Sequence, residues 1–106
     1  MLYLLNTTIL TNTGLFRLSD ISLEEVKSLI SSNNGFTSGI GHQSTADIIS
    51  SLIGASVPMN RINVYMEQGD KALCFKLDKR PEEGSILSIE QIQELGFSWK
   101  LLERLD

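Results

Sequence analysis

Cysteine and histidine each occur only once among the 106 residues of this chain. The single cysteine, Cys74, excludes an intrachain disulfide and a cysteine-based metal cluster, and its place in an apolar strand pattern predicts a buried thiol. The single histidine, His42, has no partner at the spacing that a zinc site needs. We therefore expect no metal and no other cofactor.

Positive charge is also scarce. Nine Lys and Arg residues face thirteen Asp and Glu residues, for a net charge of −4. Because binding to long DNA or RNA depends on neutralising many phosphates, the sequence argues against it, although a small basic pocket is still compatible. The apolar start Met1–Leu5 is short and lacks a cationic residue, and no stretch reaches membrane-spanning length. We expect a cytoplasmic protein without a membrane partner.

Hydrophobic periodicity and turn signals divide the chain into short elements. The length fits one domain over residues 1–106. The predicted order is β, β, α, α, β, β, α, β. We expect strands at residues 2–6, 15–18, 62–66, 73–77 and 97–101, and helices from 22 to about 31, from 44 to 53 and from 88 to 96. This order predicts an α/β or α+β domain, in which a mixed sheet is flanked by helices.

Local signals mark the ends of the predicted helices. Ser22 with Glu25, and Ser88 with Gln91, have the spacing of capping boxes at helix starts. Gly54 follows the last apolar residue of the second helix and is typical of a C-terminal stop.

An apparent β-hairpin follows the second helix. Apolar and polar residues alternate over residues 62–66, Gln68–Asp70 has the composition of a turn, and alternation resumes over residues 73–77. Antiparallel pairing of the two strands would bring Arg61 and Arg80 to the same end of the sheet. Two guanidinium groups there could clamp phosphates, or they could form surface ion pairs with acidic residues of the next loop.

The stretch Phe36–Thr45 places His42 behind Gly39 and Gly41, just before the second helix. Glycines let backbone N–H groups approach a ligand closely, and a helix start attracts anions. An imidazole there could bind a phosphate or donate a proton; alternatively, its ring simply hydrogen-bonds to the backbone at the helix entry. The pair Glu82-Glu83 could simply form a solvated face of a loop. Alternatively, one of these glutamates could lie near the imidazole of His42 and keep it protonated.

Asn6, Thr7 and Thr8 follow the first strand and could bind the polar edges of a ligand, or form an Asx-type turn. The chain has no G-x-S-x-G motif, no P-loop, no Cys–His pair and no clustered carboxylates. Hydrolases with a protein nucleophile, nucleotide triphosphatases and two-metal nucleases therefore lack support.

Four segments taken together resemble the type III anti-CRISPR ring nucleases of viruses and their cellular CRISPR-associated relatives: Leu4–Thr7, Ser38–Thr45, Asn60-Arg61 and Lys79–Gly84. The resemblance covers essentially the whole chain. It implies a two-fold homodimer that binds cyclic tetra-adenylate and cuts it without metal. The ribose 2′-hydroxyl attacks its own phosphodiester, which leaves linear di-adenylate with 2′,3′-cyclic phosphate ends.

The resemblance also implies residue roles. His42 is the expected general acid and Glu83 the second catalytic residue. The expected substrate-binding positions are Asn6, Thr7, Thr8, Gly39, Ile40, Gly41, Arg61 and Arg80. Two other interpretations stay open. One is a non-catalytic module that sequesters a cyclic oligonucleotide, and the other is an interaction protein that exposes a docking strand at Phe97, Trp99 and Leu101.

Overall fold

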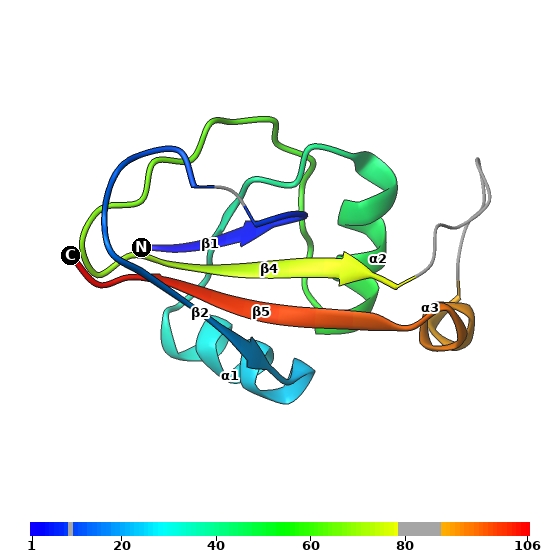
Figure 1. Ribbon diagram of the computed structural model, residues 1–106. Helices are drawn as coiled ribbons and strands as arrows, with labels where there is room; N and C mark the ends of the chain where they lie inside the picture. Colours follow the sequence, from blue (N-terminus) through cyan, green and yellow to red (C-terminus); the bar gives the residue numbers. More distant parts are fainter. Residues whose placement is uncertain (9, 79–87) are drawn as a thin grey trace.

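The computed structural model describes residues 1–8, 10–78 and 88–106 of the chain. They form a mixed sheet of five strands with three helices, which confirms the predicted α+β architecture (Figure 1). In chain order the elements are β1 (Leu2–Leu5), β2 (Phe16–Ile21), α1 (Leu23–Ser32), β3 (Thr37–Ser38), α2 (Gln43–Ile53), β4 (Lys71–Leu77), α3 (Ile89–Leu95) and β5 (Phe97–Arg104).

The strands lie in the order β2-β5-β4-β1-β3. β1 pairs in parallel with both β3 and β4, whereas β5 is antiparallel to β2 and β4. β5 therefore runs against the other four strands, and the carboxyl ends of β1, β3 and β4 point the same way. Figure 1 shows this common direction in the arrowheads of β1 and β4. Polar residues that follow these strands are thus brought to one end of the sheet.

The predicted hairpin is wrong in its pairing. The chain does turn before β4, where the Asp70 N–H donates to the Glu67 carbonyl at 2.9 Å. Residues 62–66, however, form no strand, because β1 and β5 already occupy both edges of β4. The alternation of residues 62–66 has another cause: Val64 and Met66 pack on a face of the sheet. The two-residue strand β3, in turn, was not predicted.

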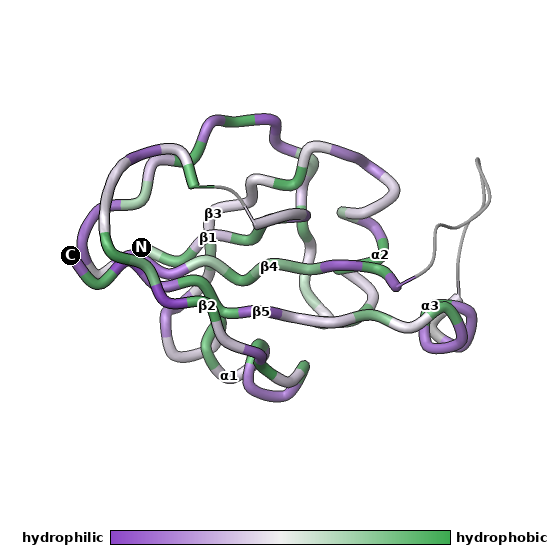
Figure 2. Tube along the Cα trace, viewed as in Figure 1, coloured by the Kyte–Doolittle hydropathy of each residue, from purple (hydrophilic) through white to green (hydrophobic). Residues whose placement is uncertain are grey.

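Side chains on the two faces of the sheet form two cores. All three helices contribute to the larger core, the helix-side core, through Val26, Ala46, Ile48, Ile49, Leu52 and Ile92. Strand residues complete it from one face, among them Leu4, Leu73, Phe75 and Trp99. The smaller core lies on the opposite face and comprises Leu5, Met66, Ala72, Cys74 and Leu102. Figure 2 shows the apolar stretches of β4 and β5 within the sheet and the hydrophilic outer turns of α3.

The helix ends follow the predicted local signals. Ser22 and Glu25 form a capping box at α1, and Ser88 and Gln91 form one at α3. Gly54 ends α2 in the left-handed conformation, at φ 70°. No helix in the described parts of the chain is long and apolar enough to cross a membrane.

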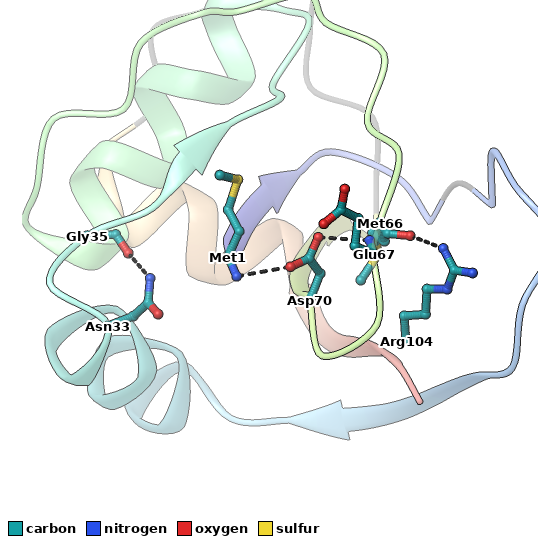
Figure 3. Close-up of polar contacts among 7 residues, drawn as sticks. All are labelled: Met1, Asn33, Gly35, Met66, Glu67, Asp70 and Arg104. Carbon is teal, nitrogen blue, oxygen red and sulfur yellow. Dashed lines mark hydrogen bonds and ion pairs between the residues drawn. The ribbon is translucent and has the colours of Figure 1, made fainter. Parts of the chain in front are cut away.

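Polar contacts tie down the amino-terminal end of β1 and β4 (Figure 3). The Asp70 carboxylate accepts hydrogen bonds from the Met1 ammonium group at 3.0 Å and from the Glu67 N–H at 2.9 Å. Burial, and then the negative charges of Asp70 and Glu67, raise the pKa of Tyr3. This end of the sheet is a structural anchor, opposite to the end where β1 and β3 finish.

A guanidinium group fastens the loops over the smaller core. Arg104 donates to the carbonyls of Thr13 and Asp106, each at 3.0 Å, and to the carbonyl of Met66 (Figure 3). The Asn12 amide also donates to Met66, at 3.1 Å. Residues 12–13 and 66 are thereby held together on the face of the sheet that the helices leave uncovered.

Candidate functional site

An open cleft of about 470 Å³ lies where β1 and β3 end. Five of the predicted site residues line it: Asn6, Gly39, Gly41, His42 and Arg61. Asn6 directly follows β1, and Gly39 follows β3. The carboxyl ends of parallel strands are the usual place for ligand sites in open sheets of this kind. The topology thus gathers residues that lie up to 55 positions apart in the sequence (61 − 6).

The segment Pro58–Arg61 carries Arg61 into the cleft by running alongside residues 38–41; we call it the strap. The Ser38 hydroxyl donates to the Pro58 carbonyl at 2.7 Å, and the Asn60 amide donates back to the Ser38 carbonyl at 2.8 Å. The Asn60 N–H then donates to the Ile40 carbonyl, also at 2.8 Å. These bonds fix the strap against the chain just before His42.

Arg61 ends the strap. Its Nε donates to the Gly41 carbonyl at 2.8 Å, and the side chain is otherwise exposed. Within residues 1–8, 10–78 and 88–106, its two Nη nitrogens take part in no hydrogen bond or ion pair. Arg61 is therefore oriented by one bond while most of its guanidinium donors remain directed at solvent, as an anion-binding arginine requires.

His42 is the N-cap residue of α2, with φ −132° and ψ 131°. Helix α2 begins at Gln43, one residue before the predicted start. The His42 carbonyl accepts the first helical hydrogen bond, from Ala46 at 3.0 Å, but its side chain makes no capping bond. The ring is exposed and lines the cleft. Within the described residues, the imidazole therefore makes no hydrogen bond to the start of the helix.

The two glycines of this stretch have different roles. A Cβ on Gly39 would lie 2.8 Å from Cδ2 of Leu5 and 3.3 Å from Cγ2 of Val64. The Gly39 N–H donates to the Leu4 carbonyl at 2.8 Å, so it is not offered to a ligand. The absence of a side chain at Gly39 is thus explained by its close packing against Leu5 and Val64, although the residue also lines the cleft. At Gly41 a Cβ would make only ordinary contacts with Arg61, at 3.5 Å and beyond.

Replacing Gly39 by alanine should destabilise the protein by about 1–3 kcal/mol, because the added methyl overpacks a site bounded by the buried Leu5 side chain. Gly41→Ala is the matched control and should change the free energy of unfolding by less than about 1 kcal/mol. Urea denaturation of both variants measures the difference. Equal stability of the two variants would contradict the packing role of Gly39.

Three other predicted binding residues do not face the cleft with their side chains. Ile40 is fully buried in the helix-side core, and its N–H and carbonyl bond to the Ser38 hydroxyl and to Asn60. Thr7 and Thr8 are exposed, and neither lines the cleft. Burial raises the pKa of the Cys74 thiol, and a hydrogen bond with the Thr8 side chain lowers it in part. Thr8 is therefore placed beside the buried cysteine.

Arg80 and Glu83, the remaining predicted residues, lie outside the described residues, as do Glu82 and most of the predicted charged loop Asp78–Gly84. The pairing that was expected to bring Arg61 and Arg80 together does not form, and Arg61 reaches the cleft through the strap instead. In the described part of the chain, no three His, Cys, Asp or Glu side chains are grouped as a metal site needs.

Two cleft residues were not predicted. Ile62 and Asn63 directly follow the strap and line the cleft with His42 and Arg61. Their place in an alternating pattern had assigned them to a hairpin strand. No short-range signal distinguishes a strand from an extended segment whose polar residues line a site.

The docking-strand interpretation of the carboxyl-terminal segment is wrong. Trp99 is buried, and its ring packs edge-on against Phe75 with the centroids 5.0 Å apart. Phe97 and Leu101 are partly buried and pack against the helix-side core. These alternating residues are part of the core.

Residues 2–99 match the sequence model of the STIV B116-like family. Protein ORF117 of Acidianus two-tailed virus is 36% identical over 110 residues, which cover 99% of this chain and 94% of the relative. YddF of Bacillus subtilis is 33% identical over 103 residues, covering 96% and 95%. Among solved structures, B116 of Sulfolobus turreted icosahedral virus superposes with a TM-score of 0.82 at 24% identity, covering 97% of this chain and 98% of that one.

Proposed function

This chain belongs to the STIV B116-like family, and we propose that it is a metal-independent ring nuclease that binds cyclic tetra-adenylate and cleaves it to linear di-adenylate with 2′,3′-cyclic phosphate ends. Its role is to switch off type III CRISPR signalling, as an anti-CRISPR protein or as a cellular off-switch. The observation that carries this proposal is that one cleft is lined both by the exposed His42 ring, which makes no capping bond, and by Arg61.

In the proposed reaction the substrate supplies its own nucleophile, so the protein does not need one. The 2′-hydroxyl oxygen of the substrate attacks the adjacent phosphorus, the bond from phosphorus to the 5′-oxygen breaks, and the departing 5′-oxygen takes up a proton. The proton of the 2′-hydroxyl passes to water. The protein must then supply orientation, a proton donor and positive charge for the phosphate.

The cleft contains groups suited to each of these tasks. His42 donates the proton to the 5′-oxygen, and Arg61 binds the phosphate oxygens. Asn6, partly buried at the end of β1, contacts the polar edge of the substrate. Arg80 and Glu83 join them in the proposal, Arg80 as a second arginine that binds phosphate and Glu83 as the second catalytic residue.

A two-fold homodimer suits this substrate. A ring of four identical nucleotides has a two-fold axis, so a C2 dimer can present one His42 to each of two opposite phosphates. The two subunits would contribute four arginines to one cavity, through Arg61 and Arg80 of each. Such a cavity concentrates positive charge locally in a chain whose net charge is −4.

The second candidate function is sequestration of the ring without turnover. Arg61 and Asn6 would serve both functions equally. The enzyme is favoured because binding alone does not need an imidazole that is exposed and left out of the helix cap.

Incubation with labelled cyclic tetra-adenylate in excess chelator tests the proposal. We expect conversion to di-adenylate carrying cyclic phosphate, identified by mass spectrometry, and binding that saturates at two chains per ring. A ring that binds but stays intact would establish the sequestering function. A ring that neither binds nor is cut, or cleavage that depends fully on added metal, would refute the proposal. Rings of other sizes, assayed in parallel, define the preferred substrate.

A further inference from the structure

An apolar row of side chains leaves the smaller core and ends in the cleft. Met66 is 3% exposed, Val64 is partly buried against the same core, and Ile62 is 43% exposed. The alternation that resembles a strand thus continues beyond the sheet and delivers one aliphatic side chain to a cleft whose other side chains are polar. An exposed aliphatic group at such a position is suited to the flat face of a ligand.

Asn63 stands next to this aliphatic group and differs from the other asparagine on the same segment. The Asn60 side-chain amide is used within the strap, where it donates to the Ser38 carbonyl. The Asn63 amide makes no hydrogen bond within residues 1–8, 10–78 and 88–106, and it is exposed in the cleft. It therefore presents a donor and an acceptor in the cleft that Ile62 also lines.

From this pairing we infer that Ile62 and Asn63 form a base-reading wall that selects adenine in the ring; the inference rests on the proposed function. Adenine presents an amino donor next to a ring-nitrogen acceptor, the pattern that a side-chain amide matches with two hydrogen bonds. This pairing uses the adenine edge that carries N7; on the same edge a 6-oxo purine presents two acceptors, its carbonyl and N7, which leaves the oxygen of the amide without a donor. Ile62 packs against the face of the base, and Asn63 reads its edge.

The test compares cleavage of cyclic tetra-adenylate with cleavage of the corresponding ring of inosine, which has the same phosphates and riboses. Wild-type protein should favour the adenine ring by roughly 10- to 100-fold in kcat/KM. Asn63→Ala should bring this ratio close to one, chiefly by lowering the rate with the adenine ring. Asn60→Ala is the matched control: it disturbs the strap, and it should slow both rings alike and keep the ratio.

The outcomes separate this inference from the proposed function. If wild-type protein cuts both rings equally, base reading is refuted while ring cleavage stands. If Asn63→Ala retains the wild-type ratio, Asn63 is not the reader and the inference fails. If neither ring is bound or cut, the proposed function fails and the inference fails with it. If Asn63→Ala loses the preference for the adenine ring over the inosine ring and Asn60→Ala keeps it, the base-reading wall is supported.

Discussion

His42→Ala is expected to slow cleavage of cyclic tetra-adenylate by about 10²- to 10⁴-fold, the usual contribution of a general acid. The loss should appear in the rate constant for cleavage that is measured under single-turnover conditions. The dissociation constant of cyclic tetra-adenylate should change by less than about threefold. The fold should survive the substitution, because the His42 imidazole makes no capping hydrogen bond and lies exposed at the cleft. Thermal unfolding of the variant checks this last point.

Gln43→Ala is the control for the His42 prediction. Gln43 is the next residue, is exposed, and bonds through its amide to Asp47 at 2.8 Å rather than lining the cleft. The Gln43→Ala variant should cut cyclic tetra-adenylate at the wild-type rate. Added imidazole should restore part of the activity of His42→Ala, since it can enter the open cleft and supply the missing proton. Full activity of His42→Ala, or an equal loss in Gln43→Ala, would remove His42 from the mechanism.

Local signals predicted the helices well, because their causes lie within a few residues. The capping boxes at Ser22 and Ser88, and the stop at Gly54, each depend on neighbours in the same turn. Strand pairing depends on distant segments instead. Residues 62–66 do alternate, but β4 pairs with β1, which lies more than sixty residues before it in the chain. Val64 and Met66 pack on a face of the sheet instead.

The candidate site was predictable in composition but not in assembly. His42 and Arg61 were identified by residue type and resemblance, and both do line the cleft. Four hydrogen bonds join the strap to residues 38–41, and the side chains of Ser38 and Asn60 take part in them; neither residue was predicted to bond to the other. The packing of Gly39 against Leu5 and Val64 was not predictable for a similar reason: a glycine needed for packing and one needed for ligand approach look the same in a sequence.

Arg61→Ala should weaken binding of cyclic tetra-adenylate by about 10- to 100-fold, the cost of losing a charge-assisted hydrogen bond to phosphate. The affinity of Arg61→Lys for cyclic tetra-adenylate should fall between the affinities of Arg61→Ala and of the wild type. Lysine keeps the charge, but it lacks the planar fork in which Nε bonds to the Gly41 carbonyl while the Nη groups reach the phosphate. Calorimetric titration at two salt concentrations measures both effects, with His42→Ala as the background that prevents turnover.

The decisive comparison for Arg61 is Arg17→Ala, which removes the same charge from the opposite side of the sheet. Arg17 lies on β2, the edge strand farthest from β3, and its guanidinium pairs with Glu103 at 2.8 Å. If the cleft arginine binds phosphate directly, Arg17→Ala should leave the dissociation constant within about twofold of its parent, because exposed charges farther apart than a Debye length are largely screened. An equal loss in the two alanine variants would instead mean that net charge governs affinity, and Arg61 would then have no specific place in the site.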